Sequence, residues 1–306
     1  VPNFFIAPIT TPGDASTYDY DQEAFLSMQS DGSLAPWDGT NRYNYAPVNH
    51  YMRPDERWSI GTIADYQVSD TSTVYGEFMY SSDKTRGQIA ESGTFFAEMY
   101  ELPITNAYFP APFLASMEEN FPGEETLGVY IGKRNVEGGP RASVMTNSSF
   151  RVVLGMQGEL EGWDYDVNYQ KNNVDSSITY INDFFAPNIT AALASATYDV
   201  FTYQGVTSEQ AAGLTGVAML RADLSTEIFQ ASASTDTGYS LPTTDGTVTV
   251  AVGVERRNMS YDRDADTVFE EGQLLGQGGP TASIAGGFNV TDVFRCVLRS
   301  SCSSSR

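Results

Sequence analysis

Alternation of apolar and polar residues is the dominant pattern in this chain of 306 residues. Between Thr247 and Glu255, valine occupies each even position, while the odd positions hold threonine, alanine, glycine and glutamate. Because successive side chains of a β-strand point to opposite faces of a sheet, a period of two predicts strands with one apolar face. We predict seven such strands, at residues 58–68, 74–80, 150–160, 163–170, 229–234, 247–255 and from 283 through 293.

The connections between these strands alternate between short and long. Short turns are expected at residues 69–72, 161–162 and 241–246. Long connections are expected at residues 82–147, 173–226 and 261–283. An antiparallel sheet that packs one face on a soluble core would show the same alternation of side chains. An outer-membrane β-barrel, however, has short turns at its periplasmic end and long loops at its outer end, so the order of connections favours that architecture.

One helix is expected within the long connections. Residues 207–210 (TSEQ) have the form of a capping box, in which the side chains of Thr207 and Gln210 satisfy backbone N–H groups at the start of a helix. Residues 211–220 follow it, although two glycines lower their helix propensity. We interpret this segment as a short surface helix inside a loop.

Composition is compatible with a barrel and not with a helical membrane protein. Hydrophobic residues make up 41% of the chain, mean hydropathy is -0.28, and the chain has no apolar run of about 18 residues, the length of a transmembrane helix. Barrel strands carry only alternate apolar residues, so they need no such run. Aromatic residues make up 12%, and Trp58, Tyr80 and Trp163 are expected near strand ends, where membrane barrels have aromatic girdles.

The chain is strongly acidic, with 39 Asp and Glu against 17 Lys and Arg and a formal net charge of -22. Such a surface repels nucleic acid, which excludes nucleic acid as a partner. We interpret the acidic groups as a solvated surface, with loops that bind cations as the alternative.

Few residues in the sequence suit catalysis. His50 is the single histidine, so a catalytic triad or a histidine-rich metal site would have to be built around it. Asp262, Asp264 and Asp266 are spaced like the start of a calcium-binding loop, but Thr267 stands where such a loop needs glycine. No phosphate-binding motif of the Walker A type occurs. We therefore predict a protein that is not an enzyme, with no catalytic residues, cofactor or metal.

Several stretches resemble, in order, barrel sequence of TonB-dependent receptors from a large proteobacterial subgroup. They are residues 42–50 (RYNYAPVNH), 53–57 (RPDER), 134–141 (RNVEGGPR), 150–160 (FRVVLGMQGEL), 205–210 (GVTSEQ), 252–256 (VGVER), 275–279 (LGQGG) and 287–290 (GFNV). The resemblance covers about residues 31–294. It implies a 22-stranded antiparallel barrel in the outer membrane of a Gram-negative bacterium, closed by an N-terminal plug domain. Such receptors take up scarce nutrients, of the siderophore, cobalamin or oligosaccharide class, with energy from the TonB–ExbB–ExbD complex.

The resemblance also sets the expected organisation of this chain. Residues 1–294 are expected to be part of the barrel, about seven of its strands with long extracellular loops. The plug domain, through which the TonB–ExbB–ExbD complex would act, is expected outside the chain. Residues 295–306 are basic, serine-rich and without alternation, so we expect a frameshifted or disordered tail. Its two cysteines, Cys296 and Cys302, are expected to have no function.

In such a barrel the apolar face of each strand would contact lipid, and the polar face would line the lumen. The candidate lumen-facing residues are Glu77, Asp164, Asp166, Asn168, Gln170 and Glu255. The expected partners are therefore outer-membrane lipid and a small nutrient ligand. The alternative hypothesis is a secreted all-β binding or adhesin module whose acidic loops bind calcium.

Overall fold

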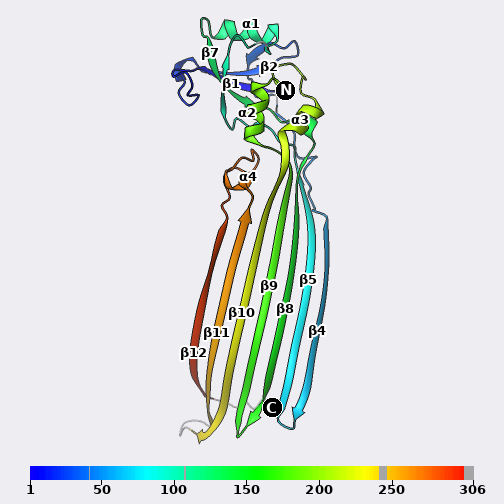
Figure 1. Cartoon of the computed structure of the whole chain (residues 1–306), viewed down its shortest axis with the longest axis vertical. Helices are drawn as coiled ribbons and strands as arrows, with labels where there is room; N and C mark the ends of the chain where they lie inside the picture. Colours follow the sequence, from blue (N-terminus) through cyan, green and yellow to red (C-terminus); the bar gives the residue numbers. More distant parts are fainter. Residues whose placement is uncertain (41, 107, 241–246, 300–306) are drawn as a thin grey trace, which may run out of the picture.

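The computed structural model describes residues 1–40, 42–106, 108–240 and 247–299. It is an all-β structure of two antiparallel sheets with short helices, as the alternation predicts. A long sheet of seven strands carries a compact domain at one end (Figure 1). We call this compact part the head domain; it comprises residues 1–40, 42–50, 90–106, 108–140 and 185–214.

The large sheet has the strand order β12-β11-β10-β9-β8-β5-β4, with every neighbouring pair antiparallel. Its strands are β4 (Asp55–Ser69), β5 (Ser72–Ile89), β8 (Arg141–Leu160), β9 (Trp163–Phe184), β10 (Thr215–Ser240), β11 (Thr247–Ala265) and β12 (Ile284–Arg299). These are the seven strands that the alternation predicts. All three long connections leave the sheet at the head-domain end, as Figure 1 shows.

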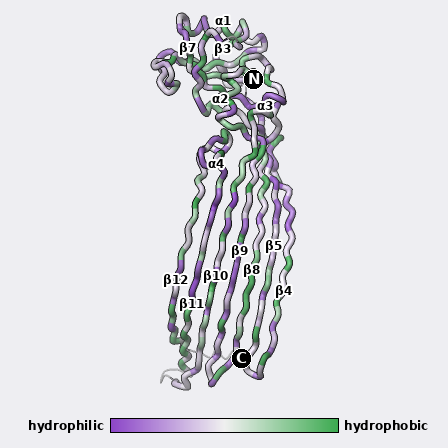
Figure 2. The backbone as a smooth tube through the Cα atoms, in the orientation of Figure 1, coloured by the Kyte–Doolittle hydropathy of each residue, from purple (hydrophilic) through white to green (hydrophobic). Residues whose placement is uncertain are grey.

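The strand register brings the predicted apolar faces of the first six strands together on one face of the large sheet, whereas in β12 Phe288 and Val290 lie on the opposite face from Val293. Residues paired directly across antiparallel strands share a face. One cross-strand row joins Tyr66, Val74, Met156, Val167, Ala231, Val254 and Val293. We call this side the apolar face and the opposite side the polar face. Figure 2 shows the resulting alternation of hydrophobic and hydrophilic residues along the strands.

Two of the predicted short turns are confirmed. Ser69 pairs with Ser72 at the β4–β5 turn. Glu161 and Gly162 connect β8 to β9 with φ angles of 52° and 80°. Two successive positive φ values characterise the tight hairpin turn whose twist matches its strands. The third predicted turn, residues 241–246, lies outside the described residues.

Several predicted boundaries are wrong because the strands run further than their alternation. β5 continues to Ile89, β8 begins at Arg141 and β9 continues to Phe184, so the connections start and end well inside the predicted loops. Tyr80 consequently lies in the middle of β5 rather than near its end. β12 continues through Arg299, past the boundary expected after Phe294, and pairs with β11 there. Residues 300–306 lie outside the described residues.

The head domain is built from segments that were expected to be irregular. Its five-stranded sheet has the order β3-β2-β1-β7-β6. The strands are β1 (Asn3–Pro8), β2 (Ala24–Met28), β3 (Leu34–Pro36), β6 (Met99–Pro103) and β7 (Thr126–Gly132). Helices α1 (Ala111–Asn120), α2 (Ala186–Ala194) and α3 (Ser208–Leu214) complete it, and α4 (Thr267–Glu270) lies near the start of the β11–β12 connection. Among the described residues, no helix has the length and apolarity that crossing a bilayer requires.

The capping box at the start of α3 is confirmed. The Thr207 side chain accepts from the backbone N–H of Gln210, and the Gln210 side chain accepts from the backbone N–H of Thr207. The helix ends at Leu214, earlier than predicted, because Thr215 begins β10 and pairs with Phe184. Sheet pairing therefore overrides the weak helix propensity of the glycine-containing residues that follow.

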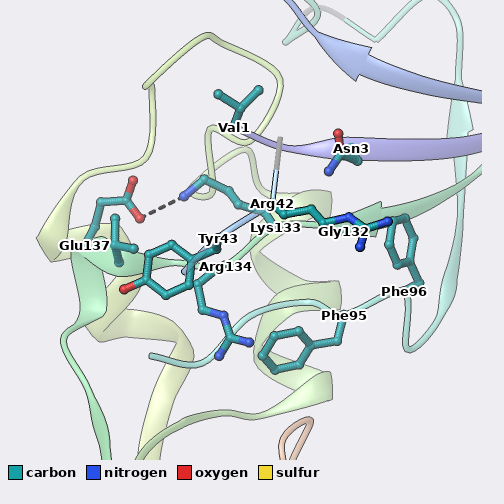
Figure 3. Close-up of a pocket in the computed structure, with 11 residues that line it drawn as sticks. Val1, Asn3, Arg42, Tyr43, Phe95, Phe96, Gly132, Lys133, Arg134 and Glu137 are labelled. Carbon is teal, nitrogen blue, oxygen red and sulfur yellow. Dashed lines mark hydrogen bonds and ion pairs between the residues drawn. The ribbon is translucent and has the colours of Figure 1, made fainter. Parts of the chain in front are cut away.

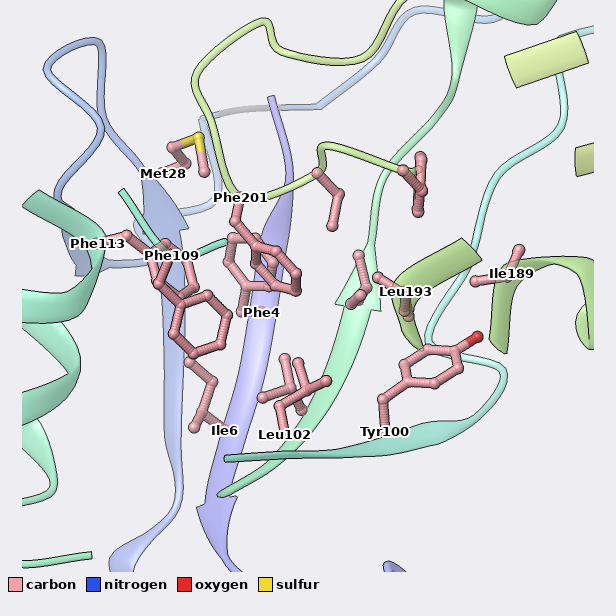
Figure 4. Packing of buried hydrophobic residues seen from close by; sticks show 14 of the residues in the cluster. Phe4, Ile6, Met28, Tyr100, Leu102, Phe109, Phe113, Ile189, Leu193 and Phe201 are labelled. Atoms are coloured by element: carbon pink, nitrogen blue, oxygen red, sulfur yellow. The ribbon is translucent and has the colours of Figure 1, made fainter. Parts of the chain in front are cut away.

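A single aromatic-rich core holds the head domain together (Figure 4). Phe4 from β1 and Phe113 from α1 are both fully buried, with their ring centroids 5.4 Å apart. Phe201, from the connection between α2 and α3, packs 5.2 Å from Phe113. The β5–β8 and β9–β10 connections thus share one core, which ties both of them to the N-terminal strands. The predicted long loops are therefore largely a folded domain.

Candidate functional site

The six polar residues predicted from the sequence all lie on the polar face of the large sheet. Asn168 and Glu255 share one cross-strand row, because both pair with Gln230. Glu77 and Gln170 share the neighbouring row, because both pair with Val153. Asp164 and Asp166 precede Asn168 on β9 at intervals of two. The structure thus brings together residues from β5, β9 and β11 that are far apart in sequence.

Four of these residues form a continuous network with two that the sequence did not single out, Tyr75 and Arg151. The Tyr75 hydroxyl donates to Asp166 Oδ2 at 2.9 Å, and Asn168 Nδ2 donates to Asp166 Oδ1 at 2.6 Å. Gln170 Nε2 donates to Asn168 Oδ1 at 3.3 Å, and Arg151 Nη2 donates to Gln170 Oε1 at 3.4 Å. Arg151 Nη1 lies 2.6 Å from Glu77 Oε2. The network crosses three strands.

Glu255 and Asp164 stay outside this network. Glu255 instead forms an ion pair with Arg257 at 2.7 Å. Asp164 is the second residue of β9, next to the turn. The Arg151 and Glu77 side chains are 41% and 31% exposed, so their ion pair contributes only about 0.2–1 kcal/mol. The network therefore orders the polar face more than it stabilises the fold.

Gly155 allows Tyr75 to reach across β8. A Cβ atom at Gly155 would lie 2.2 Å from the Tyr75 ring, so any side chain there would displace the ring. Tyr75 and Gly155 are paired across β5 and β8, whereas Asp166 lies beyond them on β9. The missing side chain thus creates the path for the Tyr75–Asp166 hydrogen bond. Tyr75 and Gly155 both occupy positions on the polar face, so their contact could have been predicted once the strand register was known.

A second candidate site is a cleft in the head domain with a volume of about 660 Å³. Its walls combine cationic and aromatic side chains (Figure 3). The lining residues are Val1, Asn3, Arg42, Tyr43, Phe95, Phe96, Gly132, Lys133, Arg134, Val136 and Glu137. The cleft was not predicted, although Arg42 and Arg134 are the first residues of two of the stretches that resemble receptor sequence. Only the fold of the head domain places them in one cleft.

The cationic groups of the cleft differ in how they are held. Lys133 is 6% exposed, and its Nζ donates to Glu137 Oε2 at 2.8 Å and to Asn135 Oδ1 at 2.9 Å. Burial lowers the pKa of Lys133, and its hydrogen bond to Glu137 opposes this shift. Arg134 Nη1 donates to the Glu91 carbonyl oxygen at 2.6 Å. Burial also lowers the pKa of Arg134, because part of its hydration is lost.

Aromatic rings frame the Arg134 guanidinium. Its Cζ lies 4.7 Å from the Phe95 ring centroid and 5.6 Å from that of Tyr43, distances typical of cation–π contacts. The Tyr43 hydroxyl donates to Glu91 Oε2 at 2.8 Å, and this hydrogen bond raises the pKa of the phenol. The ring of Tyr43 is therefore fixed beside the guanidinium by the same residue whose carbonyl accepts from Arg134.

The backbone at Phe95 and Phe96 adopts a conformation that is rare for bulky residues. Their φ angles are 48° and 54°, in the left-handed region. Such a residue costs about 1–3 kcal/mol and persists where its surroundings fix it. Here the Phe96 N–H donates to the Ile131 carbonyl at 3.0 Å. The Phe96 ring lies over Gly132, where a Cβ would be 2.0 Å from the ring. The strained backbone thus directs two rings into the cleft.

The histidine considered for catalysis and the aspartates considered for calcium binding lie on separate parts of the fold. The His50 backbone N–H donates to the Gln88 carbonyl oxygen, and its Nδ1 atom is buried without a hydrogen-bond partner among the described residues. Asp262 and Asp264 lie on strand β11, and Asp266 caps helix α4, so they do not form a calcium loop. In the described part of the chain, no group of three or more His, Cys, Asp or Glu residues could hold a metal ion.

Comparison of the chain with protein-family models, with curated proteins and with solved structures gives no match. The function of the chain is therefore inferred from the geometry of the sheet and of the cleft.

Proposed function

We propose that this chain is part of the β-barrel of a TonB-dependent receptor in the outer membrane of a Gram-negative bacterium. Such a receptor would take up a scarce nutrient of the siderophore, cobalamin or oligosaccharide class, driven through its plug by the TonB–ExbB–ExbD complex. The observation that carries the proposal is the uncovered apolar face of the large sheet. Leu154 is 59% exposed on that face, and Ile60 is 60% exposed.

The height of the apolar face matches a bilayer. On β8 its apolar residues run from Phe150 to Leu160, about 34 Å along a strand at roughly 3.4 Å per residue. Barrel strands are tilted by about 35–45°, which reduces this length to about 26 Å across the membrane. The lipid-facing apolar band of outer-membrane barrels is about 25 Å tall.

The upper limit of the apolar face is its boundary nearest the head domain. This limit lies at different cross-strand rows on different strands, which also supports strand tilt. Counted from the head domain, the first apolar residue on this face is Trp58 on β4 and Val254 on β11. The cross-strand row of Val254 meets β4 at Tyr66, eight residues beyond Trp58. When barrel strands are tilted, a plane parallel to the membrane meets successive strands at different cross-strand rows, as this boundary does. Above the limit, the same face carries Asp175, paired with Asp223.

The open edges of the sheet support a larger, closed structure. Within the described residues, β4 and β12 each pair with a neighbour on one side only. An edge strand presents unpaired N–H and C=O groups, and only closure of a barrel removes such edges altogether. Further strands beyond β4 and β12 would complete the barrel, with the polar face towards its lumen.

The membrane part of this proposal can be tested with two neighbouring positions on β8. Leu154 lies on the apolar face and Gln157 on the polar face, and both are exposed. Each would be changed to cysteine (Leu154→Cys, Gln157→Cys) in a Cys296→Ser, Cys302→Ser background, labelled with a fluorophore and reconstituted in vesicles. Lipids brominated on their acyl chains should quench the label at position 154 and leave the one at 157 bright. Equal quenching at both positions would contradict a lipid-facing apolar face.

The transport part needs a different experiment. Cells that lack the intact receptor should grow normally when nutrients are plentiful. They should grow poorly when one nutrient class, such as complexed iron, is scarce. Growth that does not differ under any such limitation would contradict a role in nutrient uptake.

A further inference from the structure

We propose that the cleft in the head domain binds an organic anion that carries a planar ring. This proposal concerns the head domain alone and does not depend on whether the large sheet spans a membrane. The ligand class follows from three features of the cleft, namely its charge, the geometry of Arg134 and the aromatic surface beside it.

The cleft is positive in a strongly acidic chain. Its lining includes Arg42, Lys133 and Arg134 but a single carboxylate, Glu137, whereas the whole chain has a formal net charge of -22. Glu137 is already paired with Lys133 at 2.8 Å. Among the described residues neither guanidinium group forms an ion pair, although the nearby charge of Glu91 opposes the effect of burial on the pKa of Arg134. A positive cleft on a negative surface concentrates anions selectively, since the remaining surface repels them.

Arg134 is oriented to receive a carboxylate. One of its donors is used by the Glu91 carbonyl oxygen, and its Cζ atom lies over the rings of both Phe95 and Tyr43. Its other N–H groups have no hydrogen-bond partner among the described residues. A fixed, planar guanidinium binds a carboxylate through two parallel hydrogen bonds. Because Arg134 has already lost part of its hydration, an anion would restore the lost interactions.

The aromatic surface beside the cleft accounts for the planar ring. Figure 3 shows Phe95 beside the Arg134 guanidinium and Phe96 beside that of Arg42. From Phe96 the aromatic surface continues to Phe25, 5.6 Å away between ring centroids, and from Phe25 to Trp37 at 4.8 Å. Flat rings stack on such faces, with centroids 4.5–7 Å apart.

A second hollow beside the cleft extends this aromatic surface. It has a volume of about 370 Å³ and shares Phe96 with the cleft. Its lining residues are Phe5, Tyr18, Phe25, Phe96, Ala97 and Tyr130. A ligand whose carboxylate binds in the cleft can therefore lay a ring across Phe96 towards Phe25.

The test uses the intact chain in detergent micelles and two probes of the same shape, 2-naphthoate and its neutral amide, 2-naphthamide. Free probe concentrations would be measured by equilibrium dialysis against empty micelles. We expect 2-naphthoate to bind about tenfold more tightly than 2-naphthamide, as one charge-assisted hydrogen bond requires. Acetate and inorganic phosphate, which lack the ring, should compete only at concentrations at least about tenfold higher than 2-naphthoate.

Variants then locate the site. Arg134→Gln should weaken 2-naphthoate binding about tenfold. Arg42→Gln should weaken it measurably, and Arg42 is exposed with no side-chain hydrogen bond or ion pair among the described residues, so the fold should survive. The matched control is Arg86→Gln, the same change at another exposed arginine that does not line the cleft. It should leave binding unchanged.

Three outcomes would overturn the proposal. Equal affinity for the two naphthalene probes would remove the need for an anion. Competition by phosphate at concentrations similar to those of 2-naphthoate would remove the need for a ring. An equal effect of Arg42→Gln and Arg86→Gln would place binding elsewhere, and this comparison decides the matter if Arg134→Gln disturbs the fold.

Discussion

At the scale of single residues, the junction between the large sheet and the head domain depends on Gly276. The fully buried Asp183 accepts hydrogen bonds from Ser92 Oγ and from the backbone N–H of Gly276, and Arg141 Nη1 lies 3.9 Å from it. A Cβ at Gly276 would lie 1.7 Å from Arg141 Nη1. Arg141 cannot move away cheaply, because its Nε donates to the Ala90 carbonyl oxygen.

We therefore expect Gly276→Ala to lower the free energy of unfolding by about 1–3 kcal/mol, because the crowded side chain must leave its buried carboxylate. Urea titration of the chain in micelles would measure the change. Gly213→Ala is the matched control, since Gly213 lies inside α3 and an added Cβ meets nothing within 4 Å. That variant should be stabilised by about 0.5–1 kcal/mol. A similar loss in both variants would contradict the crowding at Gly276.

Gly155 on the polar face allows a second prediction at this scale. Gly155→Ala should displace the Tyr75 ring, break its hydrogen bond to Asp166 and cost about 1–2 kcal/mol. In a Tyr75→Ala background the same substitution should cost nearly nothing, because the atoms that clash are gone. A double-mutant cycle with urea titration measures the difference. Equal costs in both backgrounds would mean that the ring does not lie over Gly155.

At the scale of elements, the sequence predicted strands where one face is apolar and missed their continuations. Residues 171–184 lie beyond the alternating part of β9, yet they remain in the strand because β8 and β10 pair with them on both sides. Pairing between neighbours, which local pattern does not contain, thus extends β9 to Phe184. β1 was missed for another reason, because after Asn3 it is a short, continuously apolar run, FFIAP. Such a run does not distinguish a strand from part of a helix.

The two candidate sites could be predicted from the sequence to different extents, because the first lies on strands and the second mainly on connections. The parity of positions on predicted strands placed all six polar residues on one face, from Glu77 on β5 to Glu255 on β11. The cleft could not be predicted, because Arg42 and Arg134 lie in connections whose conformation is set by the core of the head domain. In a strand, the direction of each side chain follows from a period of two, whereas in a connection it depends on how the segment packs in the fold.

The apolar face makes a prediction at the scale of one strand. Leu154→Lys places a charge near the middle of the apolar band on β8, so it should lower stability in vesicles by about 2–4 kcal/mol. Gln157→Lys makes the same charge change on the polar face and should alter stability by less than about 0.5 kcal/mol. Folding titrations in phosphocholine vesicles would compare the two. If Gln157→Lys were the more damaging variant, the polar face would be the one in contact with lipid.

At the scale of the whole molecule, a sheet one layer thick cannot bury its apolar face within the described residues. That face and the two open edges both favour association in water. We therefore expect the chain to form large, heterogeneous assemblies in buffer and a uniform species in detergent, as measured by light scattering during size-exclusion chromatography. A monodisperse, cooperatively folding monomer in buffer would exclude the barrel proposal.

Two sets of substitutions separate the effect of the apolar face from that of the edges. The first set, on the apolar face, is Leu154→Gln, Met156→Gln, Val167→Thr and Val252→Thr. The second set changes residues that are also exposed but lie on the polar face, namely Ile63→Gln, Met79→Gln, Phe288→Gln and Val290→Thr. If the apolar face drives association, the first set should shift the chain in buffer towards smaller species, whereas the second should leave its assemblies unchanged. Because the first set leaves the edge strands β4 and β12 unchanged, association that remains in that set measures how strongly those edges pair with other chains.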